Sequence, residues 1–167
     1  MSLQSAESLY VTSLEEVLCG AALVAITMVV HAFGMLMVLR VNQVATNRIR
    51  NTTSLLTGLL PVILASSLIM LVHLTEVVVW AAFFVWEGAF PNASIAYYFS
   101  LNEYTTVGSI FDLPQRWRLL EGMIAISGLL TFAWSTGILI TLAQAFQEQR
   151  MQLRQRRHGQ PSAREVK

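Results

Sequence analysis

Three long apolar runs are the feature that most constrains what this chain of 167 residues can fold into. They cover 17–39, 55–86 and 119–146, and each is long enough to cross a bilayer, which takes roughly 20 apolar residues in a helix. Only 13% of the residues are charged, against about 25% in soluble domains. The sequence therefore predicts an all-α membrane protein with three transmembrane helices.

The apolar runs divide the chain into five segments. These are an N-terminal segment 1–16, a transmembrane helix 17–40, a basic connector 41–54, a unit 55–146 that holds the second and third runs, and a basic tail 147–167.

Several local signals mark the ends of these runs. Ser13 and Glu16 have the spacing of a capping box ahead of the first apolar run. Arg40 is expected to end that helix. No Lys or Arg precedes the first run, so we expect a retained helix and not a cleaved signal peptide. Trp80 and Trp86 are expected in an interfacial aromatic belt.

Basic residues set the predicted topology. Nine of the eleven basic residues lie in the tail, in the connector 41–54, or directly before the connector at position 40. They are Arg40, Arg48, Arg50, Arg150, Arg154, Arg156, Arg157, Arg164 and Lys167. Three spans put both segments on one side, which the positive-inside rule makes cytoplasmic, so the N-terminus and 87–118 are outside. The tail either binds anionic lipids or only sets topology. A net charge of +1 indicates no nucleic-acid partner.

A stretch too short to cross the membrane lies between the second and third runs. Residues 96–108 open like a short amphipathic helix and end in Thr105-Thr106-Val107-Gly108. That order is typical of a re-entrant pore loop, in which a half-helix is followed by backbone whose carbonyls face an ion. We therefore expect a re-entrant pore helix and filter loop between the second and third transmembrane helices.

Four stretches of residues 55–146 carry a family resemblance: Tyr98-Phe99-Ser100-Leu101, Tyr104-Thr105-Thr106-Val107-Gly108, Pro114-Gln115-Arg116-Trp117-Arg118-Leu119-Leu120 and Phe132-Ala133-Trp134-Ser135-Thr136. They resemble the potassium-channel pore superfamily, and especially its small bacterial members with an outer helix, a pore loop and an inner helix. The resemblance implies a homotetramer in a bacterial inner membrane that passes monovalent cations, with potassium preferred. It implies no enzyme activity and no cofactor beyond the permeant ion. The helix 17–40 is an addition to that pore unit.

The resemblance also implies roles for single residues of the loop. Thr106, Val107 and Gly108 would present carbonyls to the ion, and Thr105 would pack at the end of the pore helix. Ser109 stands where the family has tyrosine, and Ile110 stands where it has a second glycine. Because a β-branched residue resists the backbone angles of that glycine, we expect fewer ion sites and poorer selectivity, or no conduction.

Residues beside the loop are expected to support it or to move with it. Candidates for support are Asn102, Glu103, Tyr104 and Asp112. Gly128 and Gly137 are alternative gating hinges in the last helix, although small residues there could simply permit close packing. Candidates for the cavity wall are Ser127, Thr131, Ser135 and Thr136.

Ionisable residues inside the apolar runs are functional candidates. His73 and Glu76 share one helix face and could form a pH-sensitive pair, a metal site, or hydrogen bonds to a neighbouring helix; Glu76 is expected near the outer interface. His31 is alone in the first run and is expected to be a packing residue. No metal is expected.

Two alternative functions remain open. One is a non-conducting channel subunit or membrane adaptor of the same architecture. The other is a membrane enzyme or metal-binding protein, which requires His31, His73 and Glu76 to converge at one depth. The channel instead requires a central fourfold axis lined by 105–108.

Overall fold

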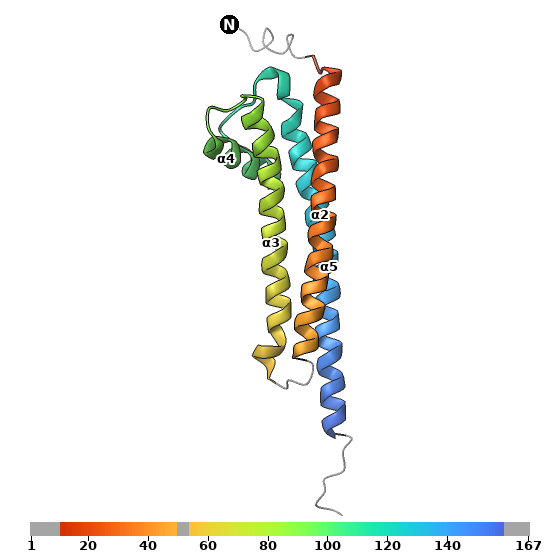
Figure 1. The fold of residues 1–167 in the computed structure, drawn as a ribbon. Helices are drawn as coiled ribbons and strands as arrows, with labels where there is room; N and C mark the ends of the chain where they lie inside the picture. Colours follow the sequence, from red (N-terminus) through yellow and green to blue (C-terminus); the bar gives the residue numbers. More distant parts are fainter. Residues whose placement is uncertain (1–10, 50–53, 159–167) are drawn as a thin grey trace, which may run out of the picture.

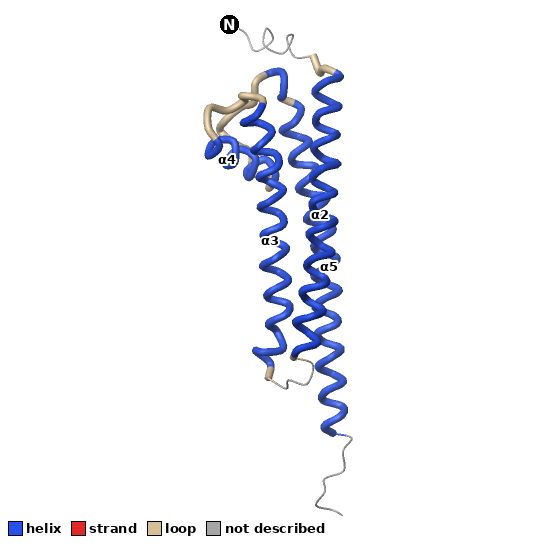
Figure 2. The backbone as a smooth tube through the Cα atoms, viewed as in Figure 1, coloured by secondary structure: helices blue, strands red, loops and turns tan. Residues whose placement is uncertain are grey.

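The computed structural model describes residues 11–49 and 54–158, and within them all regular structure is helical (Figure 2). The elements are α2 (Leu14–Arg48), α3 (Leu55–Trp86), α4 (Ala93–Tyr104), a short 3-10 helix η1 (Gln115–Trp117) and α5 (Leu119–His158). Helices α2, α3 and α5 are each long and apolar enough to cross a membrane, which confirms the three predicted helices. Three of the basic residues on which the predicted topology rests lie outside the described residues: Arg50, Arg164 and Lys167.

The first long helix, predicted over 17–40, begins at Leu14 directly after the capping residue Ser13 and ends at Arg48. The Ser13 Oγ accepts a hydrogen bond from the Glu16 amide at 3.1 Å, as in a capping box. The Glu16 carboxylate accepts from the Leu119 amide at 2.6 Å, and so joins the starts of α2 and α5. The prediction that Arg40 ends the helix is wrong, because α2 continues to Arg48. The end of an apolar run marks where a span ends, and residues 41–48 contain no Gly or Pro to stop the helix.

The other two long helices match their predicted starts. Helix α3 has the predicted bounds, and α5 begins at Leu119 and runs past 146 to His158. Gly159 and Pro161 follow directly, and such residues commonly end helices.

The three long helices run side by side, and α4 lies beside the end of α3 where α2 and α5 begin (Figure 1). Small residues permit close contact between them. A Cβ added at Gly34 of α2 would lie 2.6 Å from the Val72 side chain of α3, and one at Gly20 would lie 2.0 Å from the Met123 sulfur of α5. Such contacts are typical of helices that pack within a membrane.

The buried residues form two apolar clusters separated by polar side chains. One cluster includes Trp80, Phe84 and Phe99 near α4, and the other includes Met35 and Ile69. Along each long helix, buried polar residues lie between the two clusters: Thr27 and His31 on α2, His73 and Glu76 on α3, and Ser127, Thr131 and Ser135 on α5. The fold therefore places one polar layer inside an apolar bundle.

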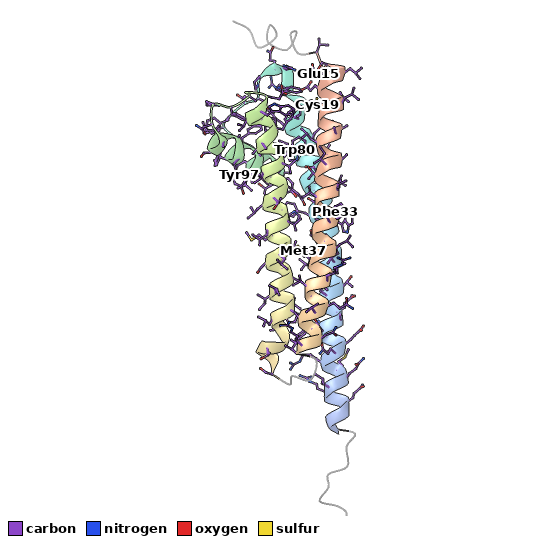
Figure 3. All side chains as sticks on the ribbon, in the orientation of Figure 1. Glu15, Cys19, Phe33, Met37, Trp80 and Tyr97 are labelled. Carbon is purple, nitrogen blue, oxygen red and sulfur yellow. The ribbon has the colours of Figure 1, made fainter. Side chains whose placement is uncertain are left out.

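The two tryptophans of α3 differ in their surroundings. Trp80 was predicted at the membrane interface, which is wrong: it is fully buried at the level of α4 (Figure 3). It shares a buried cluster with Ala96 and Phe99 of α4, because α4 packs over this end of α3. Trp86, at the last residue of α3, is 83% exposed.

Candidate functional site

Helix α4 is held at both ends. Asn92 caps its start, accepting from the Ile95 amide at 2.9 Å. At its other end, the Tyr104 carbonyl oxygen lies so close to α5 that a Cβ added at Gly128 would be 2.0 Å from it. Of the two expected hinge positions, Gly128 is thus a point of close packing, whereas a Cβ at Gly137 would meet nothing within 4 Å.

The loop after α4 has its amides and its carbonyls in different environments. Each amide of residues 105–108 donates to a carbonyl of residues 101–103 in the last turn of α4. Within the described part of the chain, the carbonyl oxygens of 105–108 accept no hydrogen bond. Thr106 and Gly108 have φ angles of 60° and 80°, in the left-handed region, and all four residues are exposed. The loop thus leaves the carbonyl groups of four successive exposed residues without a partner in the described part of the chain.

Two of the expected support residues contact the loop directly. The Glu103 carboxylate accepts from the Ser109 amide at 2.8 Å, and the Asn102 carbonyl accepts from the Val107 amide at 2.9 Å. Burial raises the pKa of the Glu103 carboxyl above its ordinary value, and the hydrogen bond from Ser109 opposes that shift. Asp112 is exposed.

The side chain of Tyr104 points away from the loop into the polar layer. Its hydroxyl donates to the Glu76 carboxylate, lies 2.8 Å from the His73 Nδ1 and lies 2.5 Å from the Thr131 hydroxyl. Tyr104 is 1% exposed and Glu76 is fully buried. Tyr104, the last residue of α4 before the loop, is therefore tied to both α3 and α5.

The first long helix completes this polar cluster, which we define as His31, His73, Glu76, Tyr104 and Ser135. The His31 Nδ1 lies 2.8 Å from Glu76 Oε1. The His73 Nε2 lies 3.0 Å from the Ser135 hydroxyl, and the His31 Nε2 lies 3.5 Å from it. One ligating atom each from His31, His73 and Glu76 lies within 4.8 Å of the other two, so these residues could hold a metal ion.

The polar cluster corrects one expectation and confirms another. His31 is not a lone packing residue, because its Nδ1 lies 2.8 Å from the buried Glu76 carboxylate. The expectation that Glu76 bonds to a neighbouring helix is confirmed on both α2 and α4. The convergence at one depth that the metal-binding alternative required is present.

The hydroxyl residues of α5 fall into two groups. Ser127, Thr131 and Ser135 recur every fourth residue, face the interior and are at most 3% exposed. Thr136 is exposed and lines a groove with a volume of about 340 Å³ between α3, α5 and the end of α4. His73, Tyr104 and Thr105 also line this groove, so it reaches both the polar cluster and the loop.

The sequence carries no signal that Tyr104 joins the loop to the polar cluster. Tyr104 lies in an aromatic segment, and hydropathy does not show whether a tyrosine there uses its hydroxyl for hydrogen bonds or only packs its ring. The four-residue spacing of Ser127, Thr131 and Ser135 was the available signal for a polar face on α5.

Comparison of the chain with protein-family models, with curated proteins and with solved structures gives no match. The function of this chain must therefore be argued from its own residues and their geometry.

Proposed function

We propose that this chain is a potassium-channel-like membrane protein that assembles as a homotetramer and passes monovalent cations along residues 105–108. The observation that carries the proposal is that the carbonyl oxygens of these four residues have no partner in the described part of the chain, whereas their amides are all bonded to the end of α4. Carbonyl oxygens in a ring can replace the hydration shell of a cation.

The depth of the loop supports this proposal. With the edge of the hydrocarbon core placed at Leu119, where the third apolar run begins, Gly128 and its contact Tyr104 lie nine residues deep, or about 14 Å along a helix that rises 1.5 Å per residue. That is close to half of a hydrocarbon core of about 30 Å. Non-helical backbone with unpaired carbonyls is tolerated at such a depth only beside protein or a water-filled cavity. A tetramer would supply both.

The electrostatics at this end of α4 favour a cation. The negative end of the α4 dipole lies at Tyr104, directly before the loop. The carboxylate of Glu103 is held beside the loop by its hydrogen bond from Ser109. Both contributions lower the energy of a positive ion near 105–108.

Exposed apolar side chains support assembly around the loop. Val107 is 74% exposed and Ile110 is 85% exposed, next to the exposed backbone of Gly108. A single loop offers one set of carbonyls, and only several copies around an axis would surround an ion. In this assembly Ser109 and Ile110 would stand at the outer half of the filter, and we expect weaker discrimination between potassium and sodium there.

The test is cation flux through purified protein in liposomes, with potassium and sodium measured separately. Gly108→Ala is the informative variant, because an added Cβ meets no atom within 4 Å and acts only through the backbone at φ 80°. Gly88→Ala is the matched control: Gly88 also has a positive φ of 67° and open space, but lies in the turn after α3.

We expect wild type and Gly88→Ala to pass potassium, and Gly108→Ala to lose most of that flux. Equal loss in both variants would attribute the effect to general backbone strain. No flux in any sample, with a tetramer confirmed by mass, would overturn conduction and leave the non-conducting subunit. A monomeric mass would overturn the proposed assembly.

A further inference from the structure

We propose that His31, His73 and Glu76 form a binding site for a divalent transition-metal ion, with the Tyr104 hydroxyl as a fourth oxygen donor. The site is distinct from the carbonyls of residues 105–108 and does not depend on conduction. Its residues come from α2, α3 and α4, and all are buried, with His73 the most exposed at 8%. An ion held there would join three helices at the middle of the bundle.

The distances between donor atoms fit an ion of this class. Bonds of about 2.0–2.2 Å from Zn²⁺ to nitrogen and oxygen put neighbouring donors of a tetrahedral site roughly 3.3 Å apart. The His31 Nδ1 lies 2.8 Å from Glu76 Oε1, and the His73 Nδ1 lies 3.6 Å from Glu76 Oε2 and 2.8 Å from the Tyr104 hydroxyl. Side-chain adjustments of under an ångström would bring these atoms to bonding distance.

The orientation of the two imidazoles is the second argument. Both Nδ1 atoms face Glu76, and both Nε2 atoms face the Ser135 hydroxyl, at 3.0 Å from His73 and 3.5 Å from His31. A histidine that binds metal through one nitrogen almost always donates its other N–H to an oxygen, which fixes the ring. A hydroxyl oxygen has two lone pairs, so Ser135 can accept from both rings.

The donor set defines the class of ion. Two imidazole nitrogens and a carboxylate suit Zn²⁺ and the neighbouring ions from Mn²⁺ to Cu²⁺, whereas Ca²⁺ and Mg²⁺ prefer oxygen-only sites. The carboxylate of Glu76 supplies one negative charge in a bundle with little other charge. The proposal therefore excludes alkaline-earth ions as the principal ligand.

A buried site also needs a route of entry. His73 and Tyr104 line the groove of about 340 Å³ between α3 and α5, and the His73 side chain is 11% exposed there. An ion entering by this groove would meet His73 first, and then Glu76 and His31 behind it. The competing arrangement is a network held only by protons, in which a histidine shares a hydrogen with Glu76.

The experiment is titration of purified protein, prepared without a polyhistidine tag, with Co²⁺ followed by visible absorption and with Zn²⁺ followed by calorimetry. Glu76→Gln and His73→Gln remove one donor each while keeping side-chain size. His158→Gln is the matched control, because His158 is the remaining histidine of the chain and is the last residue of α5. Circular-dichroism melting of each variant checks that it folds.

We expect one equivalent of Co²⁺ or Zn²⁺ per wild-type chain, unchanged by His158→Gln and weakened by about 100-fold or more in Glu76→Gln and His73→Gln. A wild type that binds neither ion, or folded variants that bind as tightly as wild type, would overturn the site and leave the proton network. Loss of binding in His158→Gln would also overturn it, by assigning the ion to the tail.

A second measurement decides the matter if the two variants fail to fold. X-ray absorption of the zinc-loaded wild type reports how many imidazoles bind the ion. Two imidazoles with oxygen donors would support the site, and coordination without two imidazoles would overturn it. Because neither readout uses ion flux, a failure here is distinguishable from failure of the proposed channel.

Discussion

Tyr104 is the residue at which the loop and the interior of the bundle meet. Its carbonyl oxygen packs against Gly128, and its hydroxyl bonds to Glu76 and Thr131. Backbone and side chain are thus fixed by different helices. Because the first loop amide follows directly, the start of residues 105–108 is positioned by the polar layer behind it.

Glu103 supports the same loop from its other side, and its titration gives a test. Burial raises the pKa of its carboxyl, so it takes up a proton at a higher pH than an ordinary glutamate, whose pKa is about 4.3. Protonation removes a negative charge near the loop and weakens the bond from the Ser109 amide. We therefore expect cation flux to fall as the pH is lowered, and to do so at a higher pH than titration of an ordinary glutamate would produce.

The control for this pH dependence is Glu103→Gln. The amide oxygen of Gln can still accept from Ser109 but carries no charge that pH can change. The variant should show lower flux at neutral pH and a flat profile. A decline in Glu103→Gln equal to that of wild type would show that another group titrates.

At the scale of elements, α4 depends on α5 for its position. The Tyr104 carbonyl, at the end of α4, occupies the space that a side chain at position 128 of α5 would need. A Cβ added at Gly122, which is also on α5, would meet nothing within 4 Å. The contact is to backbone and cannot be relieved by a rotamer change. Helix α4 would have to move for any side chain to be accepted.

Gly128→Ala and Gly122→Ala therefore form a matched pair. We expect Gly128→Ala to destabilise the protein by roughly 1–3 kcal/mol through overpacking, and to disturb the loop. Gly122→Ala should be neutral or gain up to about 1 kcal/mol of helix propensity. Thermal melting in detergent, followed by circular dichroism, measures both. Equal melting temperatures for the two variants would contradict the close contact at Gly128.

At the scale of the whole molecule, the outer surface of the bundle is apolar. Phe33 and Met37 on α2 (Figure 3) are 70% and 57% exposed. Met70 on α3 is 64% exposed. Side chains of this kind suit lipid or another subunit and would be costly in water. The starts of α2 and α5, the end of α3 and the whole of α4 lie at one end of the bundle (Figure 1).

Labelling of introduced cysteines tests the orientation of that end. In a background of Cys19→Ala, Ser94→Cys lies at the exposed start of α4 and Gln152→Cys at the exposed far end of α5. The distribution of basic residues predicts that a membrane-impermeant thiol reagent labels position 94 in intact cells and position 152 only after lysis. The reverse pattern would contradict the predicted topology.

Hydropathy and charge were sufficient to predict the three long helices, because apolar runs of this length have few other structures available. The short helix before 105–108 also followed from local sequence. The end of α2 did not, since an apolar run and a helix end for different reasons. Local pattern likewise could not decide between a hinge and a packing contact at Gly128.

Only the tertiary structure brings the residues of the polar cluster together. His31 is 42 residues from His73 along the chain and Tyr104 is 28 residues from Glu76, so sequence spacing could not reveal that their side chains meet. Trp80 became a core residue for the same reason, because α4 returns to cover it. Hydropathy reports how each helix partitions into the membrane, whereas the packing of one helix against another determines which polar groups share a site.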